Sequence, residues 1–533
     1  MTLRTTARLT VAALLLLAVA GVLLRPLAPI DETRYLAVAW EMWLSGDYFV
    51  PTRNFALYTH KPPLLFWSIN LIWAVLGVSE TAARLVGPLY AVAGVLLAGR
   101  LARSLWPADR EIGARTQIAL SGLVIFATAA GVTMFDAMLA TATVAGMLAL
   151  VTAGRTGATD RGATDRGAWR WWIAFGGALA MGVLTKGPVI LLHLLPAALL
   201  LPLWADKSWD VTWRRALAGS GVALLAGLAI VGLWLGPALV MGGPDYREAV
   251  LWTQSAGRVT DSFAHARPWW FFLAILPALT FPWVFVPAIW RAGRRAALWS
   301  EPGMRLALIW AISALVLFSL ISGKQVHYLV PELPAVALIV ARLTRDMGAF
   351  RLTWAVLPLA AAAALAVAVA AGLIPMGKGE LLLQPRSMLL AWALVIAAIG
   401  WAALLLGGLR GGAVLTLGTL LSVNLLVGLT ETRRIYDTHQ IARIVAPHEG
   451  SGLAFIGQTY HAEFNFAGRL TQPVATPTDP DAIDRWIDAH PQGVIIGRPD
   501  RVSLPWRPDE TVLFRGSPYA LWHVAQAPQK AGN

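Results

Sequence analysis

LTVAALLLLAVAGVLL, residues 9–24, is followed by Asp31-Glu32-Thr33-Arg34-Tyr35 at residues 31–35. The first stretch has most of the about 20 apolar residues that a membrane-spanning helix needs. Arg4 and Arg8 precede it as in a secretory signal peptide, but no small-residue cleavage site comes before Asp31, so we expect the helix to be retained. Two acids beside an aromatic residue, at the end of a membrane helix, indicate a reaction or ion site at the membrane edge.

The composition of the chain is that of a membrane protein. Of its 533 residues, 57% are hydrophobic and 14% are charged, and the mean hydropathy is +0.61. Soluble proteins carry about 25% charged residues, so an integral membrane protein is expected. We interpret the net charge of +13 as arginine in cytoplasmic loops, and without a contiguous basic face on a soluble domain no nucleic acid is expected as a partner. The chain has no cysteine, which excludes disulfides and cysteine-ligated metals.

Apolar runs predict an all-α polytopic membrane protein with about thirteen transmembrane helices. With the N-terminus inside, the cytoplasmic loops hold most of the arginines, as the positive-inside rule requires, and the odd number of helices puts the C-terminus outside. The fifth and sixth runs could instead form one broken hairpin around residues 185–188. The predicted spans are residues 7–27, 81–103, 115–131, 137–154, 170–185, 188–204, 216–240, 268–290, 306–321, 326–342, 353–373, 387–408 and 412–430.

Two segments outside the predicted spans complete the organisation of the chain. Residues 31–80 form a long outer loop with an amphipathic helix in the membrane interface, and this loop carries the candidate site. Residues 431–533 have balanced charges, many prolines and short apolar runs, which predict a small soluble α/β domain on the outer face. The chain is therefore divided into a transmembrane domain, residues 1–430, and this C-terminal domain. The expected strands are 453–457, 493–497, 511–515 and 520–525, with a helix over 481–490.

Three acids are candidate catalytic residues. One of the adjacent carboxylates of Asp31 and Glu32 would act as a general base or a metal ligand; the alternative is a pair that caps a helix at the membrane exit. Tyr35 comes one turn later and would share a helical face with Asp31. Asp136, at the outer end of a predicted span, is the third candidate, with helix capping as its alternative role.

A second candidate cluster is Tyr58-Thr59-His60-Lys61-Pro62-Pro63. The prolines hold the chain extended and then start a helix, which fixes Lys61 at a junction where its ammonium can bind a phosphate; snorkelling is the alternative. His60 and His265, in a later outer loop, are a candidate pair for a divalent metal, either zinc or Mg/Mn. Further outer residues could complete an electropositive pocket for an anionic lipid substrate: Lys186, Arg247, Arg258, Arg267, Lys324, His327 and Tyr328.

Taken together, these motifs resemble the polyprenyl-phosphate-sugar glycosyltransferases of the GT-C fold. The nearest branch contains the aminoarabinose transferase of lipid A and is related to the protein O-mannosyltransferases. The resemblance covers the first ten predicted helices and the plan of thirteen helices with an outer domain; within residues 431–533 it extends to layout alone. The motifs that carry it are Asp31-Glu32-x-x-Tyr35, Tyr58-x-x-Lys61-Pro62-Pro63-Leu64-Leu65-x-Trp67, Arg258-Val259-Thr260 near His265-Ala266-Arg267-Pro268-Trp269-Trp270, and Ser322-Gly323-Lys324-x-x-His327-Tyr328-x-x-Pro331.

The resemblance implies a role for each matching residue. Asp31 matches the family's catalytic acid in the first outer loop, Asp136 matches a second acid near the fourth helix, and Lys61 matches the lysine that contacts the donor phosphate. His265 matches a loop histidine that can bind a metal together with an acid next to that lysine. The family usually has Glu where this chain has His60, so a His60–His265 metal pair, loss of the metal and a different acceptor all stay open. The residues that match tyrosines lining the donor cavity are Tyr35, Tyr58 and Tyr328.

The implied activity is that of a glycosyltransferase in the bacterial inner membrane, facing the periplasm. It would move a sugar, 4-amino-4-deoxy-L-arabinose among the candidates, from undecaprenyl phosphate to lipid A or another lipid or glycan acceptor. The displacement would be single and inverting: Lys61 and the neighbouring cations would stabilise the leaving phosphate, and Asp31 would orient or deprotonate the acceptor. A monomer surrounded by membrane lipids is expected. The alternatives are a protein O-mannosyltransferase-like enzyme, a flippase or transporter of a lipid-linked sugar, and a binding or assembly protein that uses the C-terminal domain.

Overall fold

The protein is mostly helical, and many of its helices are long enough to cross a membrane. The computed structural model describes residues 2–159, 166–256, 266–377, 379–502 and 504–527. Among these residues nine helices are long and apolar enough to span a membrane, or ten if one bent pair forms a single span. The nine are α1 (Leu3–Leu24), α4 with α5 (Glu80–Arg84 and Val86–Leu105), α8 (Phe135–Thr159), α12 (Trp213–Met241), α17 (Pro302–Leu320), η4 with α18 (Val326–Glu332 and Leu333–Leu343), α19 (Thr353–Ala370), α21 (Ser387–Leu406) and α22 (Gly408–Leu429).

Three of the other predicted spans have different shapes. Residues 115–131 form α6 (Ile112–Ser121) and α7 (Val124–Ala130), two helices bent by 76° at their junction. The fifth and sixth predicted runs are separate: α9 (Arg166–Lys186) is one helix, and a broken pair follows it. Pro202, the second residue of the second helix in this pair, accounts for the break, because proline has no backbone N–H to donate. The pair is α10 (Ile190–Leu199) and α11 (Leu201–Trp204).

The structure corrects the span predicted at residues 268–290. This segment contains α15 (Phe271–Leu279), a short 3₁₀ turn and then α16 (Pro287–Arg295). Each helix has 9 residues and rises about 14 Å, roughly half of the 30 Å hydrocarbon core that a spanning helix must cross. Pro282 and Pro287 lack the backbone N–H that would continue the hydrogen-bond ladder, so the apolar run is divided even though its composition suggests a single helix.

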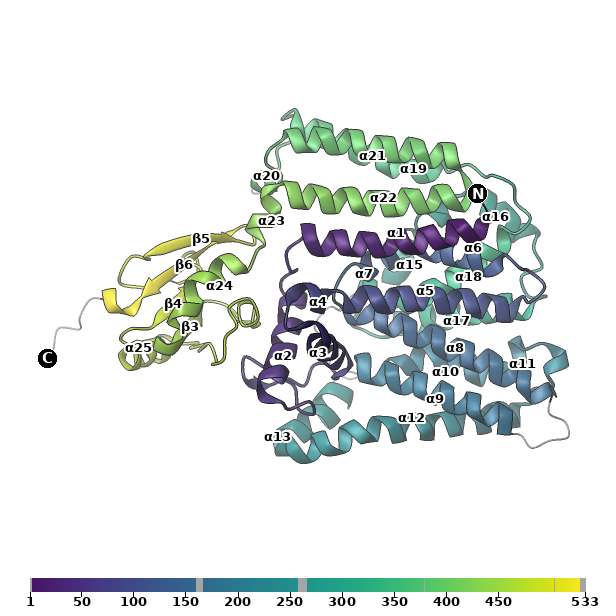
Figure 1. Cartoon of the computed structure of the whole chain (residues 1–533), viewed down its shortest axis with the longest axis horizontal. Helices are drawn as coiled ribbons and strands as arrows, with labels where there is room; N and C mark the ends of the chain where they lie inside the picture. The colour runs from purple at the N-terminus through teal and green to yellow at the C-terminus, as the bar shows by residue number, and fades with distance from the viewer. Residues whose placement is uncertain (1, 160–165, 257–265, 378, 503, 528–533) are drawn as a thin grey trace.

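The membrane helices pack side by side with α8 inside the bundle. Figure 1 shows α5, α8, α9 and α12 running alongside one another, and α8 is buried along most of its length because α5 and α9 contact it. The approach of α5 to α8 is close: a Cβ at Gly94 would lie 2.7 Å from the Thr141 hydroxyl oxygen. A side chain at Gly94 would press on Thr141, so the small glycine lets α5 pack closely against α8, the helix that carries Asp136.

The outer segment forms a compact lobe at one end of the bundle. Its first element, α2 (Asp31–Ser45), is the amphipathic helix that the sequence predicts, and its apolar face is buried. A hairpin of β1 (Thr52–Arg53) and β2 (Ala56–Leu57) then leads to α3 (Leu64–Leu76), which is too short to span the membrane. The second outer loop contains α13 (Gly243–Glu248) and one π-helical segment at Ala249–Ala256.

The C-terminal region contains the four strands and the helix expected from the sequence. The sheet has the order β3-β4-β6-β5, with β3 parallel to β4 and the other pairs antiparallel. Figure 1 shows this region beside α2 and α3, at the end of the bundle opposite to α16 and the N-terminus. Its elements are α23 (Glu431–Ile435), α24 (His439–Val445), β3 (Leu453–Ile456), α25 (Pro480–Ala489), β4 (Val494–Gly497), β5 (Glu510–Phe514) and β6 (Ser517–His523).

Candidate active site

Asp31 is the first residue of α2, where a carboxylate is favoured by the positive end of the helix dipole. Its side chain is 49% exposed, so a substrate can reach it from solvent. Tyr35, one turn later, donates a hydrogen bond from its hydroxyl to Asp31 Oδ1 at 3.2 Å, and Arg34 forms an ion pair with the same oxygen. Burial and the neighbouring Asp31 charge raise the pKa of Tyr35, which keeps its hydroxyl protonated as the donor. The sequence indicates a role for Asp31 and Tyr35, whereas the role of Arg34 becomes evident only in the structure.

Glu32 points away from this group and into the protein. It is buried, its carboxylate pairs with Arg25, and it accepts hydrogen bonds from the backbone N–H groups of Ala28 at 2.8 Å and Thr133 at 2.7 Å. Burial alone would raise the pKa of Glu32, but the charge and hydrogen bonds of Arg25 outweigh it and lower the pKa to about 2. Glu32 therefore joins the exit of α1 to the start of α8, which is a structural role rather than the catalytic one considered above.

Asp136 and Lys186 form a buried ion pair between α8 and α9. The Lys186 ammonium donates to Asp136 Oδ1 at 2.7 Å, and Asp136 is 2% exposed. The same ammonium lies 4.9 Å from the centre of the Tyr328 ring, which comes from η4. Three predicted site residues from three separate helices thus meet at one point. A buried ion pair fixes its partners in position, because neither charge can leave without a large desolvation penalty.

Phe135 and His327 connect this pair to the α2 lobe. The Lys61 ammonium lies 5.4 Å from the Phe135 ring centre, and the Tyr35 ring packs edge-on against Phe135 at 4.8 Å. The charges of Asp31, Lys61, Asp136 and Lys186 all act on the imidazole of His327. The cluster of Asp31, Tyr35, Lys61, Asp136, Lys186, His327 and Tyr328 is called the outer-face site below.

Tyr58 and His60 lie at the edge of the outer-face site. Tyr58 is buried, its backbone N–H donates to the Pro51 carbonyl at 2.9 Å, and its ring lies 5.5 Å from the His60 ring. The Arg53 guanidinium lies 5.6 Å from the Tyr58 ring centre. His60 itself is exposed. The Tyr58 ring therefore supports His60 and Arg53 rather than presenting its own hydroxyl to solvent.

Lys324 is placed differently from the other predicted cations. Its ammonium is buried and donates to the backbone carbonyl of Arg267 at 3.0 Å and to the carbonyls of Ile321 and Ser322. Burial lowers the pKa of Lys324. Because the ammonium is bound to carbonyl groups, we assign Lys324 to holding the second outer loop against the end of α17. Arg258 lies outside the described residues.

The expected metal pair cannot be assembled from the part of the chain that is described. His265 lies outside the described residues, and within the described ones no three His, Asp or Glu side chains converge on a common point. The carboxylates of the outer-face site already have cationic partners, Arg34 for Asp31 and Lys186 for Asp136. The pairing of His60 with His265 stays a prediction.

The C-terminal domain is fastened to the α2 lobe by polar contacts around Glu41. This buried carboxylate accepts from the backbone N–H of Asn54 at 2.6 Å and from the Asn465 side chain at 3.4 Å. Asn54 in turn exchanges two hydrogen bonds of 2.8 Å with the backbone of Val474. The contact brings His461 towards the outer-face site, where Asp31 is among the charges that act on it. Burial and nearby arginines lower the pKa of His461, so its imidazole is mainly neutral at pH 7.

Replacing Asn54 with glycine should loosen the C-terminal domain. The residue has a φ of 53°, which glycine adopts without strain, so the substitution removes only the side-chain hydrogen bonds, two with the Val474 backbone and a longer one from the Asn465 amide at 3.4 Å. Loss of these bonds at a part-buried contact should cost about 1–3 kcal/mol and make the domain more sensitive to limited proteolysis. Thr476→Ala, at an exposed residue nearby, is the matched control and should behave like the wild type. Equal proteolysis of both variants would contradict the contact.

The fold and the outer-face site together define a class, the polytopic membrane proteins of the GT-C fold. Comparison with solved structures supports this: the chain matches the crystal structure of ArnT from Cupriavidus metallidurans bound to undecaprenyl phosphate with a TM-score of 0.74 and 22% identity, over 98% of this chain and 99% of that one. The apo structure of the same protein matches with a TM-score of 0.75 and 21% identity over 98% of each chain. The fold of this chain is therefore that of ArnT.

Sequence comparisons agree with the resemblance noted above. The family model of dolichyl-phosphate-mannose-protein mannosyltransferases matches residues 60–235. The chain is 30% identical over 320 residues to an undecaprenyl phosphate-alpha-4-amino-4-deoxy-L-arabinose arabinosyl transferase of Pseudomonas fluorescens, and this match covers 59% of this chain and 55% of the relative. A relative of the same name from Pseudomonas aeruginosa is 33% identical over 318 residues, 58% of this chain and 54% of its own. The chain thus spans about half the length of the curated relatives it matches.

Proposed function

We propose that the protein is a glycosyltransferase that moves one sugar from a polyprenyl phosphate, undecaprenyl phosphate, to an acceptor. The observation that carries the proposal is the outer-face site, in which a solvent-accessible carboxylate, Asp31, and the cations Lys61 and Lys186 all lie near enough to His327 for their charges to act on it. Support comes from the fold, which is shared with a protein crystallised with undecaprenyl phosphate, and from relatives named as arabinosyl transferases. A phosphate that leaves during the reaction needs fixed positive charge, and an acceptor hydroxyl needs a carboxylate within reach.

The reaction is a single displacement at the anomeric carbon of the sugar. An acceptor oxygen forms the new bond to that carbon while the bond to the donor phosphate oxygen breaks, so undecaprenyl phosphate leaves with the bonding electron pair and the configuration inverts. If the acceptor is a hydroxyl, its proton passes to Asp31; if it is a phosphate, no proton moves and Asp31 acts by positioning. Tyr35 and Arg34 hold the Asp31 carboxylate for either role.

Lys61 and Lys186 stabilise the charge that develops on the leaving phosphate. Both ammonium groups are held by their surroundings, Lys61 near the Phe135 ring and Lys186 against Asp136 and Tyr328. Charge that is fixed before the reaction needs no reorganisation in the transition state, which makes it effective in catalysis. His327, on which these charges act, is available to hydrogen bond to the phosphate or the sugar.

The donor, acceptor and location form the finer part of the proposal. We place the protein in the bacterial inner membrane as a monomer, with the outer-face site and the C-terminal domain in the periplasm. We propose aminoarabinose as the sugar, because the relatives in Pseudomonas are named for aminoarabinose transfer. We propose lipid A as the acceptor, because lipid A is a lipid that carries phosphate. Transfer of a sugar to protein is the second candidate, favoured by the mannosyltransferase family model over residues 60–235.

The experiment that tests the proposal is a mass comparison of envelope molecules from cells with and without the protein. Lipid A, other envelope glycans and membrane proteins are analysed by mass spectrometry, and the protein's presence in the membrane is checked by immunoblot. A mass difference of one sugar, present only with the protein, supports the proposal and identifies sugar and acceptor together. A flippase is favoured instead if none of the three pools differs and undecaprenyl-phosphate sugar accumulates on one leaflet in the cells without the protein.

A divalent metal held by His60 and His265 is a separate part of the proposal. Imidazole is a good ligand for zinc, and His60 is exposed at the rim of the outer-face site. We expect the purified protein to retain close to one zinc per chain and His60→Ala to retain little. Elemental analysis after dialysis provides this readout without an activity assay, and His490→Ala, in the C-terminal domain, is the matched control. Equal metal content in the two variants would contradict the pair.

A further inference from the structure

The corrected segment at α16 creates a feature that the proposed function does not use. α16 places its apolar side against the bundle through Ile289, and exposes Arg291, Arg294 and Arg295 within its last two turns. Figure 1 shows α16 near the N-terminus, at the end of the bundle opposite to α2, α3 and the C-terminal domain. This short helix therefore lies at the end of the bundle opposite to the outer-face site and carries three exposed guanidinium groups.

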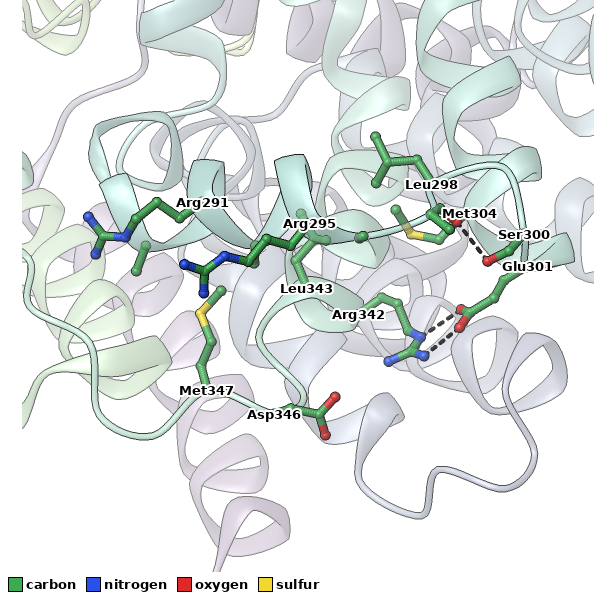
Figure 2. Close-up of a pocket in the computed structure, with 14 residues that line it drawn as sticks. Arg291, Arg295, Leu298, Ser300, Glu301, Met304, Arg342, Leu343, Asp346 and Met347 are labelled. Carbon is green, nitrogen blue, oxygen red and sulfur yellow. Dashed lines mark hydrogen bonds and ion pairs between the residues drawn. The ribbon is translucent and has the colours of Figure 1, made fainter.

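Open hollows surround α16. One, of about 510 Å³, lies between α16, the connection that follows it and the end of α18, and a second, of about 500 Å³, lies towards the start of α19. Ala288, Arg291 and Met347 line both. Figure 2 shows Arg291 and Arg295 extending from the same side of the helix, with Met347 next to Arg295. We call these two neighbouring hollows together the α16 hollow.

The charge in the α16 hollow is positive because its carboxylates are already paired. Glu301 accepts from Arg342 at 2.7 and 2.5 Å and from the Trp106 indole at 2.7 Å, as Figure 2 shows for the arginine. Asp346 lies 3.6 Å from Arg345 and is itself open to solvent. Within the described part of the chain, Arg291, Arg294, Arg295 and Arg351 have no carboxylate in ion-pair range. The hollow thus offers guanidinium groups to an anion.

Aromatic residues around the hollow place it at the membrane interface. Trp290, Trp299 and Trp354 have 57%, 58% and 59% of their surface exposed, and exposed tryptophan at helix ends is typical of the headgroup region. A third space of about 410 Å³ lies between Trp290, Arg294 and Trp354. Below Trp354, the exposed Leu357 continues the apolar surface of α19 into the membrane. The surroundings are therefore polar around the arginines and apolar along α19, which matches the polar headgroup and apolar chains of a lipid.

We propose that the α16 hollow binds the headgroup of an anionic phospholipid in the leaflet opposite to the outer-face site. Arg291 and Arg295 would bind the phosphate oxygens, since guanidinium pairs with phosphate through parallel hydrogen bonds, and the acyl chains would lie along Trp354 and α19. Juxtamembrane arginines are common on this side of membrane proteins, but here two of them share a volume large enough for a headgroup. The inference does not depend on the glycosyltransferase activity.

The test is native mass spectrometry of the full-length protein in detergent doped with phosphatidylglycerol or phosphatidylcholine of identical acyl chains. The wild type should retain phosphatidylglycerol preferentially. Arg291→Gln with Arg295→Gln should weaken its retention about thirtyfold, from the loss of two phosphate-binding charges. The matched control, Arg214→Gln with Arg215→Gln, removes two exposed arginines at the start of α12 and should retain the lipid like the wild type.

A second variant tests whether the space in the α16 hollow is needed, without changing its charge. Ala288→Phe fills space that both hollows share and keeps every arginine, so a built site predicts weaker retention of phosphatidylglycerol. Normal retention in Ala288→Phe, an equal loss in the Arg214 and Arg215 control, or equal retention of the two lipids by the wild type would each overturn the proposal. The thermal unfolding temperature of each variant, measured without added lipid, shows whether the comparison is between folded proteins.

Discussion

Replacing Asp31 with asparagine is expected to reduce sugar transfer by about a hundredfold or more while the protein stays in the membrane. Asparagine has nearly the same shape and can still accept the Tyr35 hydroxyl bond, so the geometry at the start of α2 should survive. It cannot accept a proton from an acceptor hydroxyl, and it loses the ion pair with Arg34. General-base catalysis contributes about 10²–10⁴-fold, which sets the size of the effect.

The measurement is the rate of transfer to a purified acceptor, with the amount of folded protein determined by size-exclusion chromatography. Asp481→Asn, at an exposed acid in α25, removes the same charge far from the outer-face site and should transfer at the wild-type rate. The size of the loss separates the two roles of Asp31. A decrease of less than about tenfold indicates positioning of a phosphate acceptor, and a wild-type rate would remove Asp31 from the mechanism.

The sequence predicts the α2 lobe well because its signals are local. The acids at 31–32, the apolar face of α2 and the proline pair after Lys61 lie within one segment, and their spacing determines the local structure. The strands of the C-terminal region are predicted for the same reason, since each is a short apolar run between turn residues. By contrast, apolar composition alone could not show that residues 268–290 are divided by prolines into two short helices.

The parts of the outer-face site that the sequence misses depend on contacts between distant segments. Asp136 and Lys186 are both predicted site residues, but their pairing arises only when α8 packs against α9. Glu32 and Lys324 are chosen by residue type, and the structure shows that Glu32 pairs with Arg25 and a backbone N–H before α8, and Lys324 with backbone carbonyls. His461 has no local signal at all, because its approach to Asp31 depends on how the C-terminal domain docks. Residue type suggests chemistry, and tertiary contacts decide which groups are free to perform it.

The second large effect is expected at the Asp136–Lys186 pair. Lys186→Met leaves the Asp136 carboxylate buried without its partner, which should destabilise the protein by about 3–5 kcal/mol and remove a charge that stabilises the leaving phosphate. The double variant Asp136→Asn with Lys186→Met has no buried charge at this place, so most of the stability should return. The transfer rate should not return, since loss of one such electrostatic group costs about 10²–10³-fold.

The Arg115–Asp109 pair, also buried, provides the matched control for this experiment. Arg115→Met should also destabilise the protein, though less because Asp109 keeps Arg345 at 3.8 Å, yet its transfer rate per folded molecule should equal that of the wild type, because Arg115 lies in the first turn of α6, away from the outer-face site. Thermal unfolding in detergent and the transfer assay are measured on all four proteins. Recovery of activity together with stability in the double variant would mean that Lys186 only holds the fold together. Recovery of stability alone assigns the charges of this pair to the reaction.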